Sequence, residues 1–226
     1  METQPEQIER EPISLIFEYS IESEGNRVRE TLDPKEVKWF KQNNYFVKLP
    51  GNLYLDEATS RELNEILAMI PKEFDKKLFD QEKGVIEDAW GDKESLLVKG
   101  LKSFNLVPDN EYKLILTQYG VVGSYEVNAS PKEIILNIQP GKRHLSEETV
   151  CHEIVHLCIE EWVLRYKISH QAKEHLVDLI MKDIFPEEQL QNIDQTLAAK
   201  IDKIFEANKT NIEEVVRHVG LMENAD

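Results

Sequence analysis

Apolar residues in the first half of the chain recur mainly at helical spacing. Residues 1–11 are polar and acidic, and we expect them to be frayed. A helix is expected to begin after Asp33, because the next residue, Pro34, is favoured in a first helical turn. The whole pattern predicts strands over residues 13–21 and 45–49 and helices over residues 34–43, 56–70, 72–90 and 93–104.

The second half combines short apolar runs with longer amphipathic segments. The pattern predicts strands over residues 112–117, 121–128 and 134–138, the last two as a hairpin, and helices over residues 147–166, 170–184, 187–207 and 211–222. These elements predict an α+β fold. We expect a small, mostly antiparallel sheet packed on the helix over residues 147–166 and on the helix that follows, with additional helices at both ends.

Two regions follow from this division. Residues 1–105 are assigned to a mainly helical N-terminal region of unknown role, because they contain neither metal-ligand spacing nor a phosphate-binding loop. Residues 106–226 are assigned to a second domain that carries the chemistry described next, together with C-terminal helices.

The helix predicted over residues 147–166 carries a His-Glu-x-x-His motif. His152 and His156 are four residues apart, so on a helix they share one face and can bind one metal ion. Glu153 projects beside this pair, where it can take a proton from a metal-activated water without binding the metal itself. This spacing is typical of the zinc site of a metallopeptidase. The alternative is a chance match of five residues on a surface helix.

Composition limits the classes of partner. The 226 residues include 27 Lys and Arg against 43 Asp and Glu, a formal net charge of −16. This surplus argues against nucleic acid or an anionic membrane as a partner, and it suits a cationic substrate. The apolar runs are too short to span a bilayer.

The two cysteines and the amino terminus indicate a cytoplasmic location. The first residues lack the basic and apolar segments of a secretory leader. Cys151 and Cys158 lie seven residues apart on one predicted helix, about 10 Å by helical rise, so they cannot form a disulfide without unwinding it. Reduced cysteines are typical of the cytoplasm.

A catalytic zinc ion usually has three protein ligands, so the histidine pair needs a further donor. The helix predicted over residues 170–184 offers His170, Glu174, His175 and Asp178. Glu174 and Asp178 are four residues apart and share a stripe with apolar residues, which favours their packing against the neighbouring helix. The alternative is a solvated acidic face on an acidic protein.

These two helices resemble those of the gluzincin metallopeptidases, and in particular their thermolysin-like members. The resemblance rests on the His-Glu-x-x-His motif followed by Glu174 and Asp178, and it covers roughly residues 112–182. It implies that Glu174 is the third zinc ligand and that Asp178 orients His152. The compact length is similar to that of the minigluzincins, whereas residues 1–105 have no counterpart in the family.

The resemblance also implies where a substrate binds. Asn128 and Ala129 match the Asn-Ala pair of the family's edge strand, which holds peptide substrate. The chain differs from the family in having Lys173 where an asparagine precedes the glutamate. A metzincin site is excluded, because Ile159 replaces the required glycine and Trp162 stands where the third histidine would be.

We therefore expect a zinc-dependent peptidase that acts on a peptide or protein substrate; the sequence does not indicate an oligomeric state. One alternative is a non-catalytic protein in which the zinc site serves structure and the helical first half binds a partner. A latent peptidase, whose terminal helices cover the cleft, is a further alternative. Residues that could stabilise an oxyanion by type are Tyr119, Tyr125, Tyr166, His144 and His218.

Overall fold

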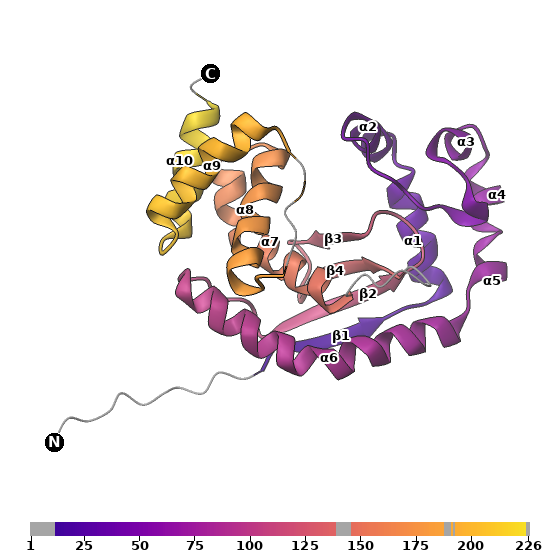
Figure 1. Ribbon diagram of the computed structural model, residues 1–226. Coiled ribbons are helices and arrows are strands. Elements are labelled where there is room, and N and C mark those ends of the chain that lie inside the picture. Colours follow the sequence, from indigo (N-terminus) through magenta and orange to yellow (C-terminus); the bar gives the residue numbers. More distant parts are fainter. Residues whose placement is uncertain (1–11, 139–145, 188–190, 192, 225–226) are drawn as a thin grey trace.

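The computed structural model describes residues 12–138, 146–187, 191 and 193–224 (Figure 1). Residues 1–11, for which fraying was predicted, and His144 lie outside these residues. The elements, in chain order, are β1 (Ser14–Glu18), α1 (Ile21–Thr31), α2 (Pro34–Gln42), η1 (Pro50–Asn52), α3 (Leu55–Thr59), α4 (Leu63–Leu67), α5 (Ile70–Glu73), α6 (Lys76–Ser103), β2 (Glu111–Thr117), β3 (Gly123–Glu126), β4 (Lys132–Asn137), α7 (Ser146–Tyr166), α8 (His170–Ile184), α9 (Gln195–Asn208) and α10 (Ile212–Glu223).

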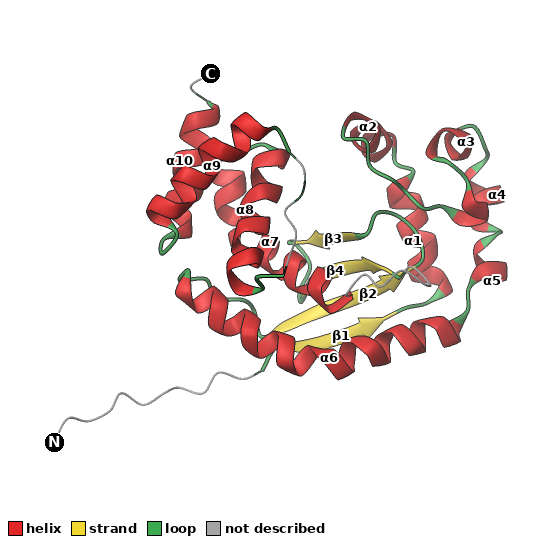
Figure 2. Cartoon of the chain, in the orientation of Figure 1, coloured by secondary structure: helices red, strands yellow, loops and turns green. Residues whose placement is uncertain are grey.

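The α+β class is confirmed, but the sheet is mostly parallel rather than mostly antiparallel. Its order within the described residues is β1-β2-β4-β3; β1 and β4 both run parallel to β2, and β3 runs antiparallel to β4 (Figure 2). The predicted β3–β4 hairpin is present. The local hairpin pattern does not specify the strand on the other side of β4. Tertiary packing places β2 there.

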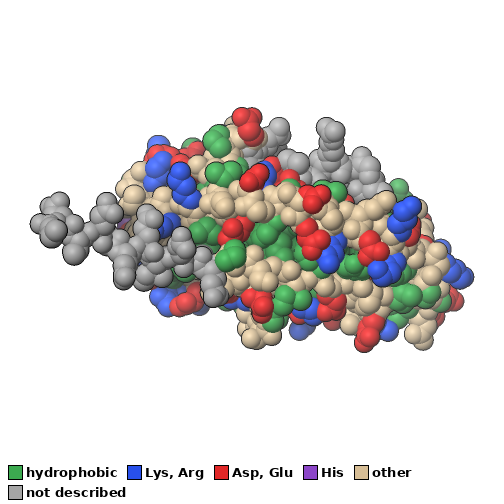
Figure 3. Space-filling view, turned by 90° about the horizontal axis from the view of Figure 1, so that it is seen from below, with side chains coloured by type: hydrophobic (Ala, Val, Ile, Leu, Met, Phe, Trp, Pro, Cys, Tyr) green, Lys and Arg blue, Asp and Glu red, His purple; other side chains and the backbone are tan. Residues whose placement is uncertain are grey.

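Helices surround the sheet unequally. In Figure 1, α6 runs beneath it, α7–α10 form one group at the left, and α1–α5 form another at the right. Seen from below, acidic and basic side chains are interspersed with apolar ones over the described part of the face that α6 crosses (Figure 3). Within the described sheet β3 pairs only with β4, so one edge of β3 has no strand beside it. In Figure 1 this edge lies between the two helix groups.

The strand predicted over residues 13–21 is too long, and α1 was missed. A capping box ends the strand: the Ser20 hydroxyl accepts from the Ser23 N–H at 2.9 Å, and the Ser23 hydroxyl accepts from the Ser20 N–H at 2.8 Å. Among the buried residues of α1, Val28 is the one large aliphatic residue, whereas Glu24 and Arg27 are charged. A helix that buries charged residues lacks the apolar periodicity by which helices are predicted.

Several predicted boundaries in the helical segments are also wrong. The strand over residues 45–49 is reduced to one isolated bridge between Lys48 and Gly120. The helix over residues 56–70 is divided into α3, α4 and α5, and the two helices over residues 72–104 merge into α6. Helix α9 begins only at Gln195, because Asp194 caps it by accepting from the Leu197 N–H at 2.9 Å.

The two regions assigned from the sequence share one sheet and one main core. Strand β1 and helix α6 come from residues 1–105. The α6 side chains Phe79, Ile86 and Leu97 belong to the same buried cluster as Leu114 and Ile154. A second cluster lies among α1, α2, α4 and the residues that follow β2. That residues 1–105 form a separate domain remains a prediction. A substitution in the core of α6 tests it.

We expect Ile86→Ala to lower the free energy of unfolding by about 2–5 kcal/mol, because it removes a fully buried side chain and leaves a cavity. The neighbouring Val85→Ala is the matched control: Val85 is 55% exposed, so its effect should stay within about 0.5 kcal/mol. Urea unfolding followed by circular dichroism measures both. A shared core predicts one transition that shifts as a whole, whereas a second transition insensitive to Ile86→Ala would show that residues 106–226 unfold separately.

Candidate metal centre

The helix that carries the motif is confirmed, with bounds close to those predicted. Val150, Ile154 and Leu157 recur on one face of α7 and are buried in the main core, which fixes the rotation of the helix. His152 and His156 lie one turn apart on another face of α7, and their ring centroids are 4.7 Å apart. Packing of α7 against α8 and β3 then determines which groups face the two imidazoles.

The metal-ligand group consists of His152, His156 and Glu174. The two Nε2 atoms lie 3.0 Å apart, and Glu174 Oε2 lies 3.5 Å from His152 Nε2 and 3.4 Å from His156 Nε2. Ligands at 2.0–2.2 Å from one tetrahedral zinc ion are separated from one another by about 3.3–3.6 Å. Two of the three separations fall in this range, and the third, 3.0 Å between the two Nε2 atoms, is somewhat shorter. The three donor atoms therefore suit zinc in number and chemical type, and their spacing is close to that of zinc ligands.

The pKa values of His156 and Glu174 suit the binding of a cation. Burial lowers the pKa of His156 to about 4, which keeps its imidazole neutral at pH 7. Burial acts to raise the pKa of Glu174, but hydrogen bonds from His152 and His156 outweigh it and hold that pKa below its ordinary value. For His152, burial opposes protonation, but the hydrogen bond with Glu174 and the charges of Glu153 and Glu174 outweigh it and raise the pKa above its ordinary value, so this ring must give up its proton when a metal binds. A neutral imidazole and an ionised carboxylate are the forms that bind a metal.

Glu153 lies in the same cavity as His156 and Glu174 and is 6% exposed. Burial raises the pKa of its carboxyl to about 7, which is suitable for a group that accepts a proton near neutral pH. Gly123 allows β3 to approach this side chain, because a Cβ at that position would overlap the Glu153 carboxylate. Glu153 thus lies between the metal-ligand group and the start of β3.

Asp178 lies beside the ring nitrogen of His152 that faces away from the metal-ligand group. Its Oδ1 atom is 3.8 Å from His152 Nδ1, longer than a hydrogen bond, and its Oδ2 atom accepts from the Gln191 N–H at 2.6 Å. The orientation of His152 by Asp178 stays a prediction. The structure brings the two residues together without a direct hydrogen bond.

The two other histidine candidates occupy different environments. His170 Nδ1 lies 3.4 Å from Glu174 Oε1, the oxygen that does not face the histidine pair, and its Nε2 atom lies 2.8 Å from the Tyr45 hydroxyl. His175 Nε2 lies 2.8 Å from Asp202 Oδ1 on α9, away from the group. The geometry therefore favours Glu174 as the further donor.

Of the described oxyanion candidates, Tyr125 is the one that lines the cavity. Its ring stacks on His156 at a centroid distance of 5.2 Å, and its hydroxyl donates to Glu160 at 2.5 Å and accepts from Lys173 at 2.9 Å. Burial, together with the bond to Glu160, raises the pKa of Tyr125. The remaining tyrosine and histidine candidates pair elsewhere: Tyr119 with Glu73, Tyr166 with Glu213, and His218 with Glu214 and Arg217.

The predicted substrate-binding pair lies just beyond β3, in the turn to β4. Asn128 is exposed, and its backbone and side-chain nitrogens both donate to Glu126 Oε1, at 2.8 and 3.0 Å. Ala129 is half-buried. Neither residue is among those that line the cavity at the metal-ligand group, so their role in binding substrate stays a prediction.

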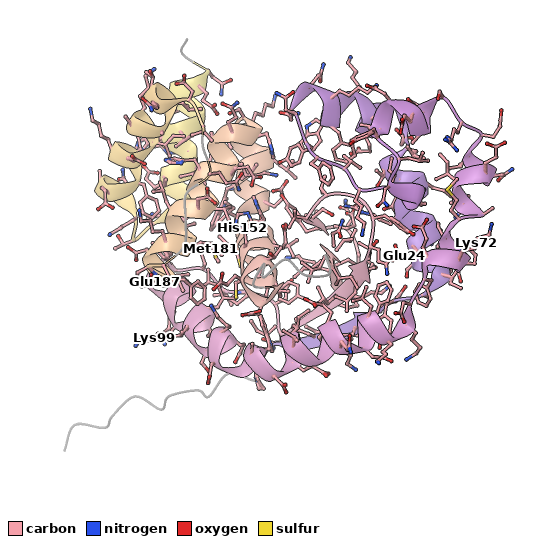
Figure 4. The ribbon with its side chains drawn as sticks, turned by 45° about the vertical axis from the view of Figure 1, so that its right-hand side comes forward. Glu24, Lys72, Lys99, His152, Met181 and Glu187 are labelled. Carbon is pink, nitrogen blue, oxygen red and sulfur yellow. The ribbon has the colours of Figure 1, made fainter. Side chains whose placement is uncertain are left out.

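The cavity has a volume of about 390 Å³ and is built from both halves of the chain. Figure 4 labels His152 on α7 and Glu24 on α1, which lie on opposite sides of the region above the sheet. The assignment of the chemistry to residues 106–226 missed one wall of this cavity, formed by Arg27, Trp39, Phe40 and Tyr45. No motif marks these residues, because Tyr45 and its partner His170 are 125 positions apart in the chain.

Comparisons with protein-family models, with curated proteins and with solved structures found no significant match. The described part of the chain contains no helix that combines the length and the apolarity of a membrane span.

Proposed function

We propose that this protein is a zinc-dependent peptidase whose metal is held by His152, His156 and Glu174. The observation that carries the proposal is the convergence of two imidazole nitrogens and one carboxylate oxygen at 3.0–3.5 Å, with the Glu153 carboxylate in the same cavity. A structural zinc site is usually closed by a fourth protein ligand, often cysteine. Within the described residues the group comprises three such ligands, which favours a catalytic site.

The residues of the cavity divide the chemistry among them. Zinc, when bound, supplies Lewis-acid activation of a water molecule. Glu153 would take a proton from the water that attacks the scissile peptide carbonyl, and would return it to the amine that leaves as the C–N bond breaks. Tyr125, stacked on His156, fixes the position of that imidazole, and the aromatic wall from α2 limits the access of bulk water.

The resemblance to gluzincins, and to minigluzincins in particular, forms part of this proposal. Glu174 on the helix after the motif, with Asp178 one turn later, follows the order that the resemblance implies. A peptide substrate and a cytoplasmic location are also proposed. The thiol state of Cys151 and Cys158 supports that location.

A latent form of the same peptidase is the second candidate, favoured by one contact. The Gln191 side chain donates from Nε2 to Glu174 Oε2 at 3.3 Å, and this oxygen is the one that faces the histidine pair. Gln191→Ala should then increase both zinc affinity and activity. Removing the chain beyond Phe185 is a poorer test, because it also removes the buried side chains of Phe205 and Val216.

Metal content and proteolysis of denatured casein test the proposed function together. We expect one zinc ion per chain by mass spectrometry, loss of cleavage on treatment with a chelator, and its return on addition of one equivalent of zinc. Casein is a suitable probe because an unfolded chain presents peptide bonds in extended conformation. A stoichiometric zinc protein without cleavage, both as wild type and as Gln191→Ala, would favour the non-catalytic alternative.

A further inference from the structure

Arg27 is a buried cation in the wall of the cavity opposite the motif helix. It is 9% exposed and belongs to α1, in the part of the chain that the family resemblance does not cover. It lines the cavity together with Glu153, Ser124 and the aromatic residues of and after α2. A guanidinium group in such a position requires an explanation, because arginine is rarely buried without a partner.

The surrounding backbone and hydroxyl groups hold the guanidinium in place. Arg27 Nη2 donates to the Ser124 hydroxyl on β3 at 3.0 Å. Gly120, with φ of +85°, packs directly on the guanidinium, and a Cβ there would overlap it. Since β3 also contacts Glu153 through Gly123, Arg27 and the proposed base adjoin consecutive residues of the same strand.

The nearby carboxylates do not saturate this arginine. Glu24, one turn earlier on α1, accepts from the Thr117 hydroxyl at 2.6 Å and from the Gln118 N–H at 2.8 Å. Glu30 Oε2 is 3.9 Å from Nη1, beyond hydrogen-bond distance, and its side chain is 61% exposed. Arg27 Nε has no hydrogen-bond partner within the described residues, but it is buried against Gly120, so the donors left for a ligand are those of the two Nη atoms. The guanidinium therefore keeps donors available in a largely desolvated site.

Guanidinium donors of this kind suit one class of ligand. A planar fork of N–H groups matches a carboxylate, and a charge-assisted pair is stronger where water is excluded. The cavity also carries the carboxylates of Glu36, Glu153 and Glu174, and its other lysine or arginine, Lys173, donates to the Tyr125 hydroxyl at 2.9 Å. Arg27 therefore defines one end at which an anionic group is accepted. Trp39, Phe40 and Tyr45 line the wall between that end and His170 and offer apolar surface to the rest of a ligand.

We propose that Arg27 binds a carboxylate of the peptide substrate, at the end of the cavity next to Ser124 and Glu153. This inference rests on the proposed function for its substrate class. The carboxylate is either the C-terminus of the peptide or the side chain of an Asp or Glu close to the scissile bond. Either source makes the protein selective for an anionic group, despite its own strongly negative charge.

Peptide binding to the full-length, metal-free chain tests this inference without turnover. The probes are acetyl-Phe-Ala-Phe-Ala as free acid and as amide, and acetyl-Phe-Ala-Glu-Ala-amide with its Gln counterpart, measured by isothermal titration calorimetry. In one of the two pairs, we expect the peptide that carries the carboxylate to bind about tenfold tighter, or more, than its uncharged counterpart. The free-acid pair reports a C-terminal carboxylate, and the Glu/Gln pair reports a side chain.

Substitutions then assign the preference to Arg27. Arg27→Gln should abolish it, and Arg27→Lys should retain only part of it, because lysine keeps the charge but not the fork. Arg29→Gln, an exposed arginine on the same helix, is the matched control and should leave the preference unchanged. A preference that survives Arg27→Gln in a folded variant, or equal binding within both pairs, or no binding of any probe at millimolar concentration, overturns the inference.

The two proposals fail in distinguishable ways. An Arg27-dependent preference in the metal-free chain, combined with no casein cleavage by the zinc-loaded protein, supports the carboxylate site and rejects the peptidase. Cleavage of casein without an Arg27-dependent preference supports the peptidase and rejects the carboxylate site.

Discussion

Glu153→Gln should reduce peptide cleavage by about 10²–10⁴-fold while zinc content stays at one ion per chain, since the substitution removes a general base and leaves all three proposed ligands in place. The amide has nearly the same shape as the carboxylate, so it fits the space beside Gly123. It cannot accept a proton from the attacking water. The measurement is kcat/KM on a fluorogenic peptide that the wild type cleaves, with zinc determined on the same sample.

A matched substitution on the same helix provides the control for this result. Glu161→Gln makes the same chemical change on α7, at a side chain that is 77% exposed and contacts Arg165, and it should leave kcat/KM within a factor of about two. Cleavage by Glu153→Gln at the wild-type rate would reject Glu153 as the base, whatever the metal content.

Glu174→Ala should largely abolish zinc retention, because it removes the one anionic donor of the metal-ligand group. The wild-type site offers Glu174 Oε2 at 3.4–3.5 Å from both imidazole nitrogens, and alanine leaves only the histidine pair. Zinc affinity, measured by competition with a chromophoric chelator, should fall far more in Glu174→Ala than in a variant that replaces any other acidic residue of α8 with alanine. Unchanged affinity would show that a different group, such as His170, completes the site.

Asp178→Ala separates a ligand from a residue that acts through a ligand. We expect zinc affinity to fall by about 10–100-fold, the loss that follows when a partner of a metal-bound histidine is removed. Asp183→Ala on the same helix is the control, because Asp183 pairs with Lys209 at the surface and should not affect zinc. An affinity as high for Asp178→Ala as for Asp183→Ala would show that Asp178 does not orient His152.

The parts predicted correctly from the sequence depend on neighbours close in the chain. The spacing of His152, Glu153 and His156 is a property of one helix, and α7 confirms that helix almost residue for residue. Helix α8 also follows from a local signal, since Ser169 caps it by accepting from the Ala172 N–H at 3.2 Å. That Glu174 lies near the histidine pair followed from resemblance, and the packing of α8 on α7 places it there.

The parts that were missed or wrong depend on contacts between distant segments. The parallel pairing of β4 with β2 and of β1 with β2 joins strands that no turn connects, so the mostly antiparallel sheet was an extrapolation from one hairpin. Arg27 is buried by contacts with Gly120 and Ser124, more than ninety residues away, on a helix without apolar periodicity. The cavity wall from the first half was therefore not predictable from patterns along the chain.

Anomalous diffraction at the zinc absorption edge, from crystals grown with one equivalent of zinc, locates the metal and its ligands. We expect a single strong peak enclosed by His152 Nε2, His156 Nε2 and Glu174 Oε2, at about 2.0–2.2 Å from each. The Glu153 carboxylate should lie beyond bonding distance of the peak. A peak bound to other residues, a fourth protein ligand on the metal, or Glu174 turned away from the two histidines would contradict the assignment of this site as the catalytic centre of a zinc peptidase.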